Sequence, residues 1–364
     1  MTGAPPLPMT AKPEMPSGWQ RAGPIITLIL LPAVIAELLF GAIRITTLFA
    51  LIPATGAWGC GALLIRDIIR RGGRGWASLG LMAAALAVAE ECVIQQTSFT
   101  PLVGVDPNHV YGRAFGVNWV YFLWAVGYES VWAVIIPILL AELLFPNRRE
   151  APWLRRRGLT IASFVFLGAS FVAWYFWTQI FVPQFFPESA YVVPLTHAAA
   201  AFAAIGLLVA AAISLRPVRK LRPSQSVQRP WLAGVAGFIV GTLWFTLVLL
   251  AFGAAPSVPP AIPLVSGIAA GSVSLVAVHV WNKRFGWGDV NVLALIMGAV
   301  TACMLTGFLV LYGSGAPPID FVGKVVLNVL AGSALAVWLM RLLKSPPPSH
   351  ADGEVGTTSS RPPA

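Results

Sequence analysis

Apolar residues occur along the chain in runs of about 20, and short polar or basic connections separate these runs. An α-helix needs about 20 apolar residues to cross the hydrocarbon core of a membrane. The pattern therefore predicts membrane-spanning helices. Their predicted bounds are 24–43, 46–66, 76–99, 117–145, 158–181, 191–215, 231–253, 261–281, 289–312 and 322–342.

The composition supports this pattern, because 57% of the 364 residues are hydrophobic and only 10% are charged. A soluble domain carries about 25% charged residues, and a soluble chain with so little charge would aggregate. The predicted fold class is all-α, a polytopic transmembrane helix bundle of about ten spans. Residues 1–22 are rich in Pro and residues 345–364 are rich in Pro, Ser and Thr, so both segments are predicted to be disordered. Residues 23–344 then form the transmembrane helical domain.

Basic residues predict the orientation of these spans. Of the 24 Lys and Arg residues, only Arg44, Arg113 and Lys324 fall on one side of the predicted membrane. Cytoplasmic connections carry most Lys and Arg in membrane proteins, so both termini are predicted to be cytoplasmic. Lys324 and Asp320, four residues apart, are expected to form an exposed helical pair at the outer end of the last span.

The same basic connections suggest which partners to expect. They are predicted to touch anionic lipid headgroups of the bilayer, and the expected location is the bacterial cytoplasmic (inner) membrane. The formal net charge is +10. Nucleic acid is nevertheless not an expected partner, because no continuous basic face with interleaved aromatic residues is present. Protein partners are not identified.

Motifs for nucleotides, cofactors or metals are missing from the sequence. No phosphate-binding G-x-x-x-x-G-K occurs, and the connections are too short for a soluble domain. Cys60, Cys92 and Cys303 lie far apart, without the spacing of a metal knuckle or a redox pair. They are predicted to be small buried hydrophobic side chains. No cofactor is expected, and no metal is assigned.

Four acidic residues lie inside the predicted spans, namely Glu37, Glu90, Glu91 and Glu129. A carboxylate at the centre of a membrane helix costs about 2.5–3.5 kcal/mol on insertion scales. No Lys or Arg is predicted at a matching depth. The cost must therefore be lowered by protonation, by a shared proton, by a bound cation or by water.

Depth along the predicted spans places these four carboxyl groups and the ring of His197 in one layer, in the outer half of the membrane. Gln95 lies four residues after Glu91 and is predicted to share its helix face. This layer indicates a proton, cation or substrate site. The structural alternative is a hydrogen-bonded cluster that holds helices together. The predicted site residues are Glu37, Glu90, Glu91, Gln95, Glu129 and His197.

The stretch "EECVIQQ" (90–96) resembles the E-E-x-x-x-R signature of the CAAX-protease and bacteriocin-processing membrane family. The resemblance covers about seven residues, and Gln95 stands at the arginine position. It implies a buried hydrolytic site in which a glutamate, Glu90 or Glu91, activates water. The chain as a whole is similar to bacterial multi-span membrane proteins, a resemblance that brings no activity with it.

Three functions remain open at this point. The preferred one is a transporter-like protein with a buried acidic proton or cation site. The second is an intramembrane hydrolase in which Glu91 activates water, Glu90 or Glu129 assists, and His197 holds the oxyanion or a metal. The third is a non-catalytic membrane subunit whose buried acids are structural. Whether the protein is an enzyme is left open.

Overall fold

The computed structural model describes residues 18–186, 192–216, 229–285 and 288–344, and these residues are almost entirely helical. Within them, ten helical segments are long and apolar enough to cross a membrane, as expected of a multi-pass membrane protein. The segments predicted to be disordered lie outside the described residues, with one correction. The first helix begins at Gly18, so residues 18–22 are helical and belong to the bundle.

The apolar segments are built from one to four helical stretches each. The first five are α1 and η1 (Gly18–Pro32, Ala33–Leu38); η2, α2, η3 and α3 (Ile45–Ala50, Leu51–Ala54, Thr55–Gly59, Cys60–Arg71); α4 and η4 (Trp76–Ala89, Glu90–Ile94); α5, η6 and α6 (Trp119–Tyr128, Glu129–Ile135, Ile136–Leu144); and α7, η8 and α8 (Arg156–Tyr175, Phe176–Phe181, Val182–Phe185). The other five are α9 (Leu195–Ser214), α10 (Pro230–Ala251), α11 (Ala261–Phe285), α12 (Asp289–Gly313) and α13 (Pro318–Lys344).

The connections carry little regular structure. Two short 3-10 turns, η5 (Pro107–His109) and η7 (Pro146–Arg148), lie in them. The described strands are β1 (Arg113–Ala114) and β2 (Val117–Asn118), which pair antiparallel as a small hairpin before α5.

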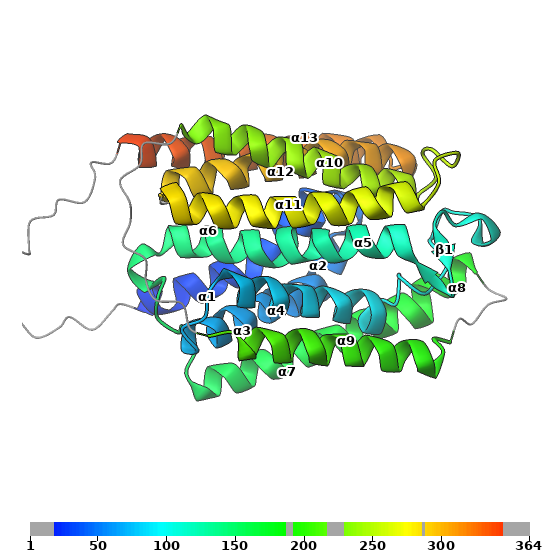
Figure 1. Ribbon diagram of the computed structural model, residues 1–364, viewed down its shortest axis with the longest axis horizontal. Coiled ribbons are helices and arrows are strands. Elements are labelled where there is room, and N and C mark those ends of the chain that lie inside the picture. The colour runs from blue at the N-terminus through cyan, green and yellow to red at the C-terminus, as the bar shows by residue number, and fades with distance from the viewer. Residues whose placement is uncertain (1–17, 187–191, 217–228, 286–287, 345–364) are drawn as a thin grey trace, which may run out of the picture.

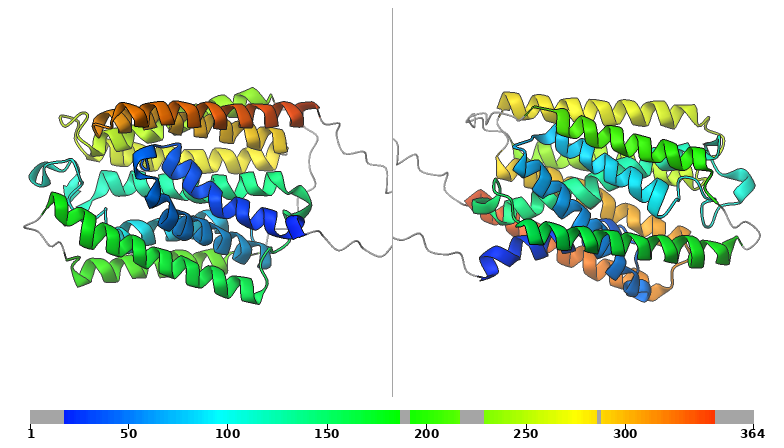
Figure 2. Two further views of the ribbon diagram at one scale, coloured as in Figure 1. Left: turned by 180° about the vertical axis from the view of Figure 1, so that it is seen from behind. Right: turned by 90° about the horizontal axis from the view of Figure 1, so that it is seen from below.

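The helices lie side by side along the long axis of the molecule (Figure 1). The segment α5–η6–α6 runs through the middle, with α10 to α13 on one side and α1, α3, α4, α7 and α9 on the other. Figure 2 shows the same two groups from behind. The start of α1 and the end of α13 lie at one end of the bundle, opposite the β1–β2 hairpin. We call the two ends the arginine end and the hairpin end.

Aromatic rings fill the core along the central segment. Trp124 stacks on Tyr128 and Tyr128 on Trp132, with ring centroids 5.0 and 5.7 Å apart. Residues spaced by four lie on one face of a helix, so these three rings form a column. Phe40 and Phe245 pack against the column from the two flanking helix groups. The column therefore joins both halves of the bundle.

Buried ion pairs stabilise the arginine end. Arg66 is 1% exposed, and its Nε lies 3.0 Å from Glu142, which also binds Arg70 at 2.5 Å. Asp67 accepts hydrogen bonds from the backbone N–H of Trp153 and its neighbour. The second helix therefore continues past its predicted end at residue 66, because Glu142 on α6 compensates the charges of its last turns.

The prediction of an exposed pair on the last helix is wrong. Asp320 is 1% exposed and Lys324 is 2% exposed, and they do not bind each other. Asp320 accepts two hydrogen bonds from Thr46, and the Lys324 ammonium donates to the carbonyl of Leu39. The turn between η1 and η2 packs onto this part of α13, and for that reason both charges are buried.

Candidate acidic site

The four glutamates predicted as site residues all lie in wide, π-helical turns. Glu37 belongs to η1, Glu90 and Glu91 to η4, and Glu129 to η6. Hydrogen bonds between residues five apart define these turns, such as the bond from Gln95 N to Glu90 O at 2.8 Å. Such turns are rare in proteins overall, and many of those that occur lie at functional sites. They place carboxyl groups from three helical segments at the same level of the bundle.

The wide turn at η4 changes the partner of Gln95. The sequence analysis predicted that Gln95 shares the helix face of Glu91. This would hold only if the turn between them were α-helical. In the structure the Gln95 amide donates to Glu90 Oε1 at 2.8 Å. The predicted helix over 76–99 also ends early, at Ile94, because Gln96 adopts a left-handed conformation with φ 61° and turns the chain back.

Glu91 receives three hydroxyl groups. Thr97 Oγ1 and Ser98 Oγ lie 2.8 and 3.0 Å from Glu91 Oε2, and the Tyr121 hydroxyl lies 3.3 Å from Oε1. These three partners were missed by the sequence analysis. Thr97 and Ser98 follow Gln95 and Gln96 at the end of an apolar run, which is only a weak signal for a site. Tyr121 is one of many aromatic residues in the spans, and no sequence signal distinguishes it.

Glu129 faces Glu91 from the central segment. The two carboxyl groups are in hydrogen-bonding contact. Glu129 is 9% exposed, and among the described residues no hydroxyl, amide or other N–H group donates to its Oε2. Two ionised carboxylates at this range would repel each other strongly in a buried site. The contact therefore needs a proton, a cation or a water molecule between them.

Glu90 and Glu37 complete the acidic cluster, which we define as Glu37, Glu90, Glu91 and Glu129. Glu90 lies within electrostatic range of Glu91 and of Glu37, and Glu129 lies within range of all three others. Glu37 also contacts the side chain of Trp58 on η3. Glu37 is partly exposed, whereas the other three side chains are buried. The structure thus brings together the four glutamates that the sequence analysis singled out.

The structure does not bring His197 to the acidic cluster. Its Nε2 lies 2.8 Å from the carbonyl oxygen of Phe115, and its ring meets Phe99 edge-on with centroids 5.2 Å apart. His197 therefore holds the connection at the hairpin end. The predicted layer is wrong in this member, because the helix predicted from residue 191 begins only at Leu195, so His197 lies in its first turn and not at the level of the glutamates.

A buried asparagine fixes the chain above Glu91. Asn118 is 0% exposed, and its amide donates to the carbonyls of Thr97 and Thr100 at 2.9 and 2.8 Å. Its backbone N–H donates to Ser98 O at 2.9 Å, and Arg113 donates to its side-chain oxygen. We call residues 97–118 the strap. Through Thr97 and Ser98, the strap closes the hairpin end of the acidic cluster.

The cysteines and the metal-binding potential complete the description. Cys60, Cys92 and Cys303 are buried, as predicted, and each carries a free thiol. In the part of the chain that the structure describes, no three His, Cys, Asp or Glu side chains are arranged to hold a metal ion. The acidic cluster is therefore a set of carboxyl groups rather than a preformed metal centre.

Comparisons with known proteins find no protein-family model, no curated protein and no solved structure that matches this chain. The function is therefore inferred from the geometry of the acidic cluster.

Proposed function

We propose that this protein is a transporter-like membrane protein that binds a proton in the acidic cluster. The Glu91–Glu129 contact is the proton-binding pair, and Glu90 and Glu37 exchange protons with it. In this proposal the ten apolar segments span the membrane, both termini are cytoplasmic, and the cluster lies in the outer half.

The observation that carries the proposal is the missing countercharge. Among the described residues, no Lys or Arg forms an ion pair with a glutamate of the cluster. The same chain compensates its structural acids differently. Glu142 binds two arginines, and Asp67 binds Arg71 at 2.6 Å. An ionised carboxyl group that is buried without a cation is costly, so uptake of a proton or an external ion would stabilise the acidic cluster, and such residues inside membranes mark ion and proton paths.

A proton fits the contact better than a metal ion does. A single proton between two carboxyl groups gives a hydrogen bond and removes one negative charge. The hydroxyl groups on Glu91 then stabilise the charge that remains on the pair. A bound metal ion would need several oxygen ligands arranged around it, and the described carboxyl groups are not arranged in that way.

The two alternative functions have less support. A hydrolase would need a group to hold the oxyanion near Glu91, and His197, the residue assigned to that role, binds Phe115 O instead. A purely structural cluster would not account for Glu129 Oε2, to which no donor among the described residues is directed. The resemblance of "EECVIQQ" to the CAAX-protease signature stays a second proposal, which E91Q would also test by loss of hydrolysis.

The test is proton binding and proton flux in the purified protein. Infrared spectra over a pH range should show a carboxylic C=O band that disappears at alkaline pH and is missing in E91Q and in E129Q. In liposomes containing a pH-sensitive dye, both variants should lose proton flux. The matched control is D289N, because Asp289 pairs with Arg149 at 2.9 Å at the arginine end, outside the acidic cluster. If neither the band nor the flux depends on Glu91 or Glu129, the proposal is wrong.

A further inference from the structure

The helix that carries Glu37 breaks directly after it. The carbonyl oxygen of Glu37 accepts hydrogen bonds from the N–H groups of Gly41 and Ile43, at 2.9 and 3.2 Å. Gly41 has a φ of 90°, which a residue with a side chain rarely adopts. The backbone of Glu37 is thus part of the turn over residues 39–44, and a displacement of this turn would displace Glu37 as well.

Lys324 binds the chain at the start of this break, where the helix that carries Glu37 ends. Its Nζ donates to Leu39 O at 2.6 Å, and the ammonium also lies over the Phe308 ring, 5.2 Å from the centroid. The last carbonyl groups of a helix have no partner within the helix and carry a partial negative charge. A buried ammonium at this point satisfies a carbonyl of the helix end and opposes its dipole.

Asp320 binds the second end of the break. Its two carboxylate oxygens accept from Thr46 N at 3.0 Å and from Thr46 Oγ1 at 2.9 Å, at the start of η2. The first N–H groups of a helix carry a partial positive charge, so a carboxylate stabilises them. Asp320 and Lys324 stand one turn apart on α13. Each therefore meets the helix end of opposite polarity.

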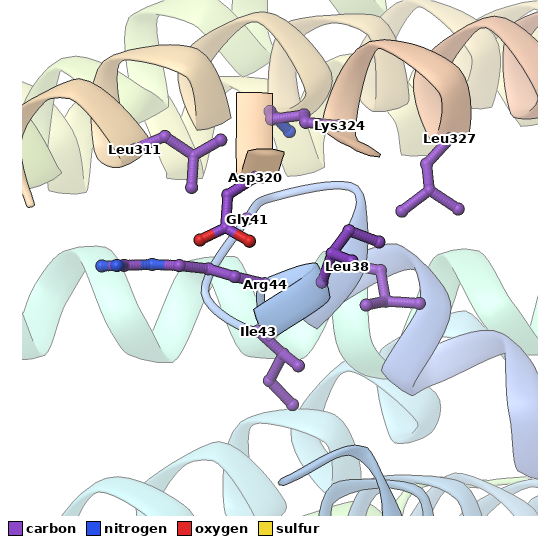
Figure 3. Close-up of a pocket in the computed structure, with 9 residues that line it drawn as sticks. Leu38, Gly41, Ile43, Arg44, Leu311, Asp320, Lys324 and Leu327 are labelled. Atoms are coloured by element: carbon purple, nitrogen blue, oxygen red, sulfur yellow. The ribbon is translucent and has the colours of Figure 1, made fainter. Parts of the chain in front are cut away.

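The packing around these contacts leaves little free space. A Cβ on Gly307 would lie 2.0 Å from Phe40 O, so only glycine allows α12 to approach the turn this closely. Figure 3 shows Asp320 pointing toward the turn at Gly41 and Arg44, with Lys324 on the same helix. The cavity between them measures about 10 Å³, which is room for about one water molecule. A change in the position of α13 is therefore transmitted to the turn.

We infer that Asp320 and Lys324 are positioning residues for Glu37. By holding both ends of the break over residues 39–46, they fix the carboxyl group of Glu37 relative to the other three glutamates. This inference rests on the proposed function, because it assigns a role to Glu37 within the acidic cluster. It adds α13, a helix that contributes no carboxyl group to the cluster, as the element that sets the geometry of the cluster.

The energetic cost of burying Asp320 and Lys324 supports a specific role for these two charges. Buried charged groups in an apolar helix are expensive, and apolar residues of similar volume often replace buried ion pairs without loss of stability. The two charges nevertheless stand at the one place where they bind the turn after Glu37. Their backbone partners, Leu39 O and Thr46 N, lie within nine residues of Glu37 on the same stretch of chain.

The test follows the infrared bands of Glu37 itself. Its carboxyl and carboxylate bands are identified by their loss in E37Q, and those of the pair by their loss in E91Q. We expect K324M and D320N to shift the Glu37 bands or their titration midpoint, and to leave the bands of the pair unchanged. The control is N328A. Asn328 lies one turn beyond Lys324, and its amide donates to Met304 O on α12 instead of to the turn. N328A should leave both sets of bands as in the wild type.

A purely structural role would give a different result. K324M would then lower the thermal stability and leave the Glu37 bands in place, which would overturn the inference. If K324M or D320N does not fold, T46V replaces them. It removes only the hydroxyl bond to Asp320, and an unshifted Glu37 band in T46V would overturn the inference equally. The readout does not need transport. Titrating bands without proton flux would contradict the transporter proposal alone.

Discussion

The carboxyl groups of Glu91 and Glu129 meet between two helical segments, and the two groups have unequal surroundings. Glu91 receives hydrogen bonds from Thr97, Ser98 and Tyr121. Glu129 Oε2 receives none from a hydroxyl, amide or other N–H group of the described residues. This asymmetry gives Glu91 and Glu129 different roles in the pair. The Glu91 carboxyl group is stabilised by hydrogen bonds from the protein. The Glu129 carboxyl group depends on a proton, cation or water molecule between the two groups.

We expect E129Q to stabilise the protein while it abolishes proton binding. The amide of Gln has the shape of a carboxyl group and donates a hydrogen bond to Glu91 without a shared proton. In the wild type the shared proton supplies this bond, so the gain is expected at alkaline pH, where the pair has lost its proton. One added hydrogen bond then contributes about 1 kcal/mol to the free energy of unfolding. Thermal unfolding in detergent at alkaline pH should show a higher midpoint for E129Q than for the wild type, whereas E129A, which leaves Glu91 without this partner, should unfold at a lower temperature than E129Q. A lower midpoint for E129Q would contradict the contact.

Substitution of Glu142 by Gln should change the stability of the protein in the opposite direction to E129Q. It compensates Arg66 and Arg70, so E142Q leaves a buried guanidinium without its countercharge. Removal of one partner from a buried ion pair costs about 3–5 kcal/mol. We expect E142Q to lower the unfolding midpoint strongly, and the double variant R66M/E142L to recover much of the loss. Recovery by the double variant distinguishes charge compensation from simple loss of packing.

The connection at the hairpin end should show a pH dependence of its own. The Asn108 N–H, and then His109, lower the pKa of the Asp106 carboxyl. The carboxylate form therefore stabilises the turn η5 at neutral pH, and this stabilisation is lost as the pH falls through the lowered pKa. Hydrogen exchange of residues 103–112, corrected for the intrinsic pH effect, should increase at acidic pH in the wild type. D106N should exchange at the faster rate throughout, and an unchanged rate in D106N would argue against this role.

Apolar length was sufficient to predict the helices, because a run of about 20 apolar residues is a local property of the sequence. Glu37, Glu90, Glu91 and Glu129 were equally visible, since they are the acidic residues inside the predicted apolar spans. The local pattern could not determine where each helix begins in the fold or in which direction a side chain points. His197 was expected at the depth of the glutamates, but α9 begins only at Leu195, so His197 lies at the hairpin end and binds Phe115 O.

The wide turns explain the other differences between expectation and structure. A π-helical turn changes the register by one residue, so Gln95 binds Glu90 where an α-helical turn would align it with Glu91. The burial of Asp320 and Lys324 has a similar origin. Their spacing fits an exposed helical pair, and only the turn over residues 39–44, distant in sequence, covers them. Tertiary contacts of this kind leave no pattern in the sequence of α13.

Asn118 offers a test of the strap, because one side chain holds it over Glu91. N118A removes two hydrogen bonds to the carbonyls of Thr97 and Thr100 and the acceptor for Arg113. At about 0.5–1.5 kcal/mol for each of the three bonds, we expect the free energy of unfolding to fall by about 1.5–4.5 kcal/mol.

The same variant should open the hairpin end of the acidic cluster, and the native cysteines report on this. Cys92 follows Glu91 directly and is buried, and Cys60 is buried on a different segment. In N118A a small thiol reagent should label Cys92 several times faster than in the wild type, while labelling of Cys60 stays slow. Equal acceleration at both cysteines would indicate general loosening of the bundle. Faster labelling of Cys92 alone would show that the strap controls access to the Glu91–Glu129 pair.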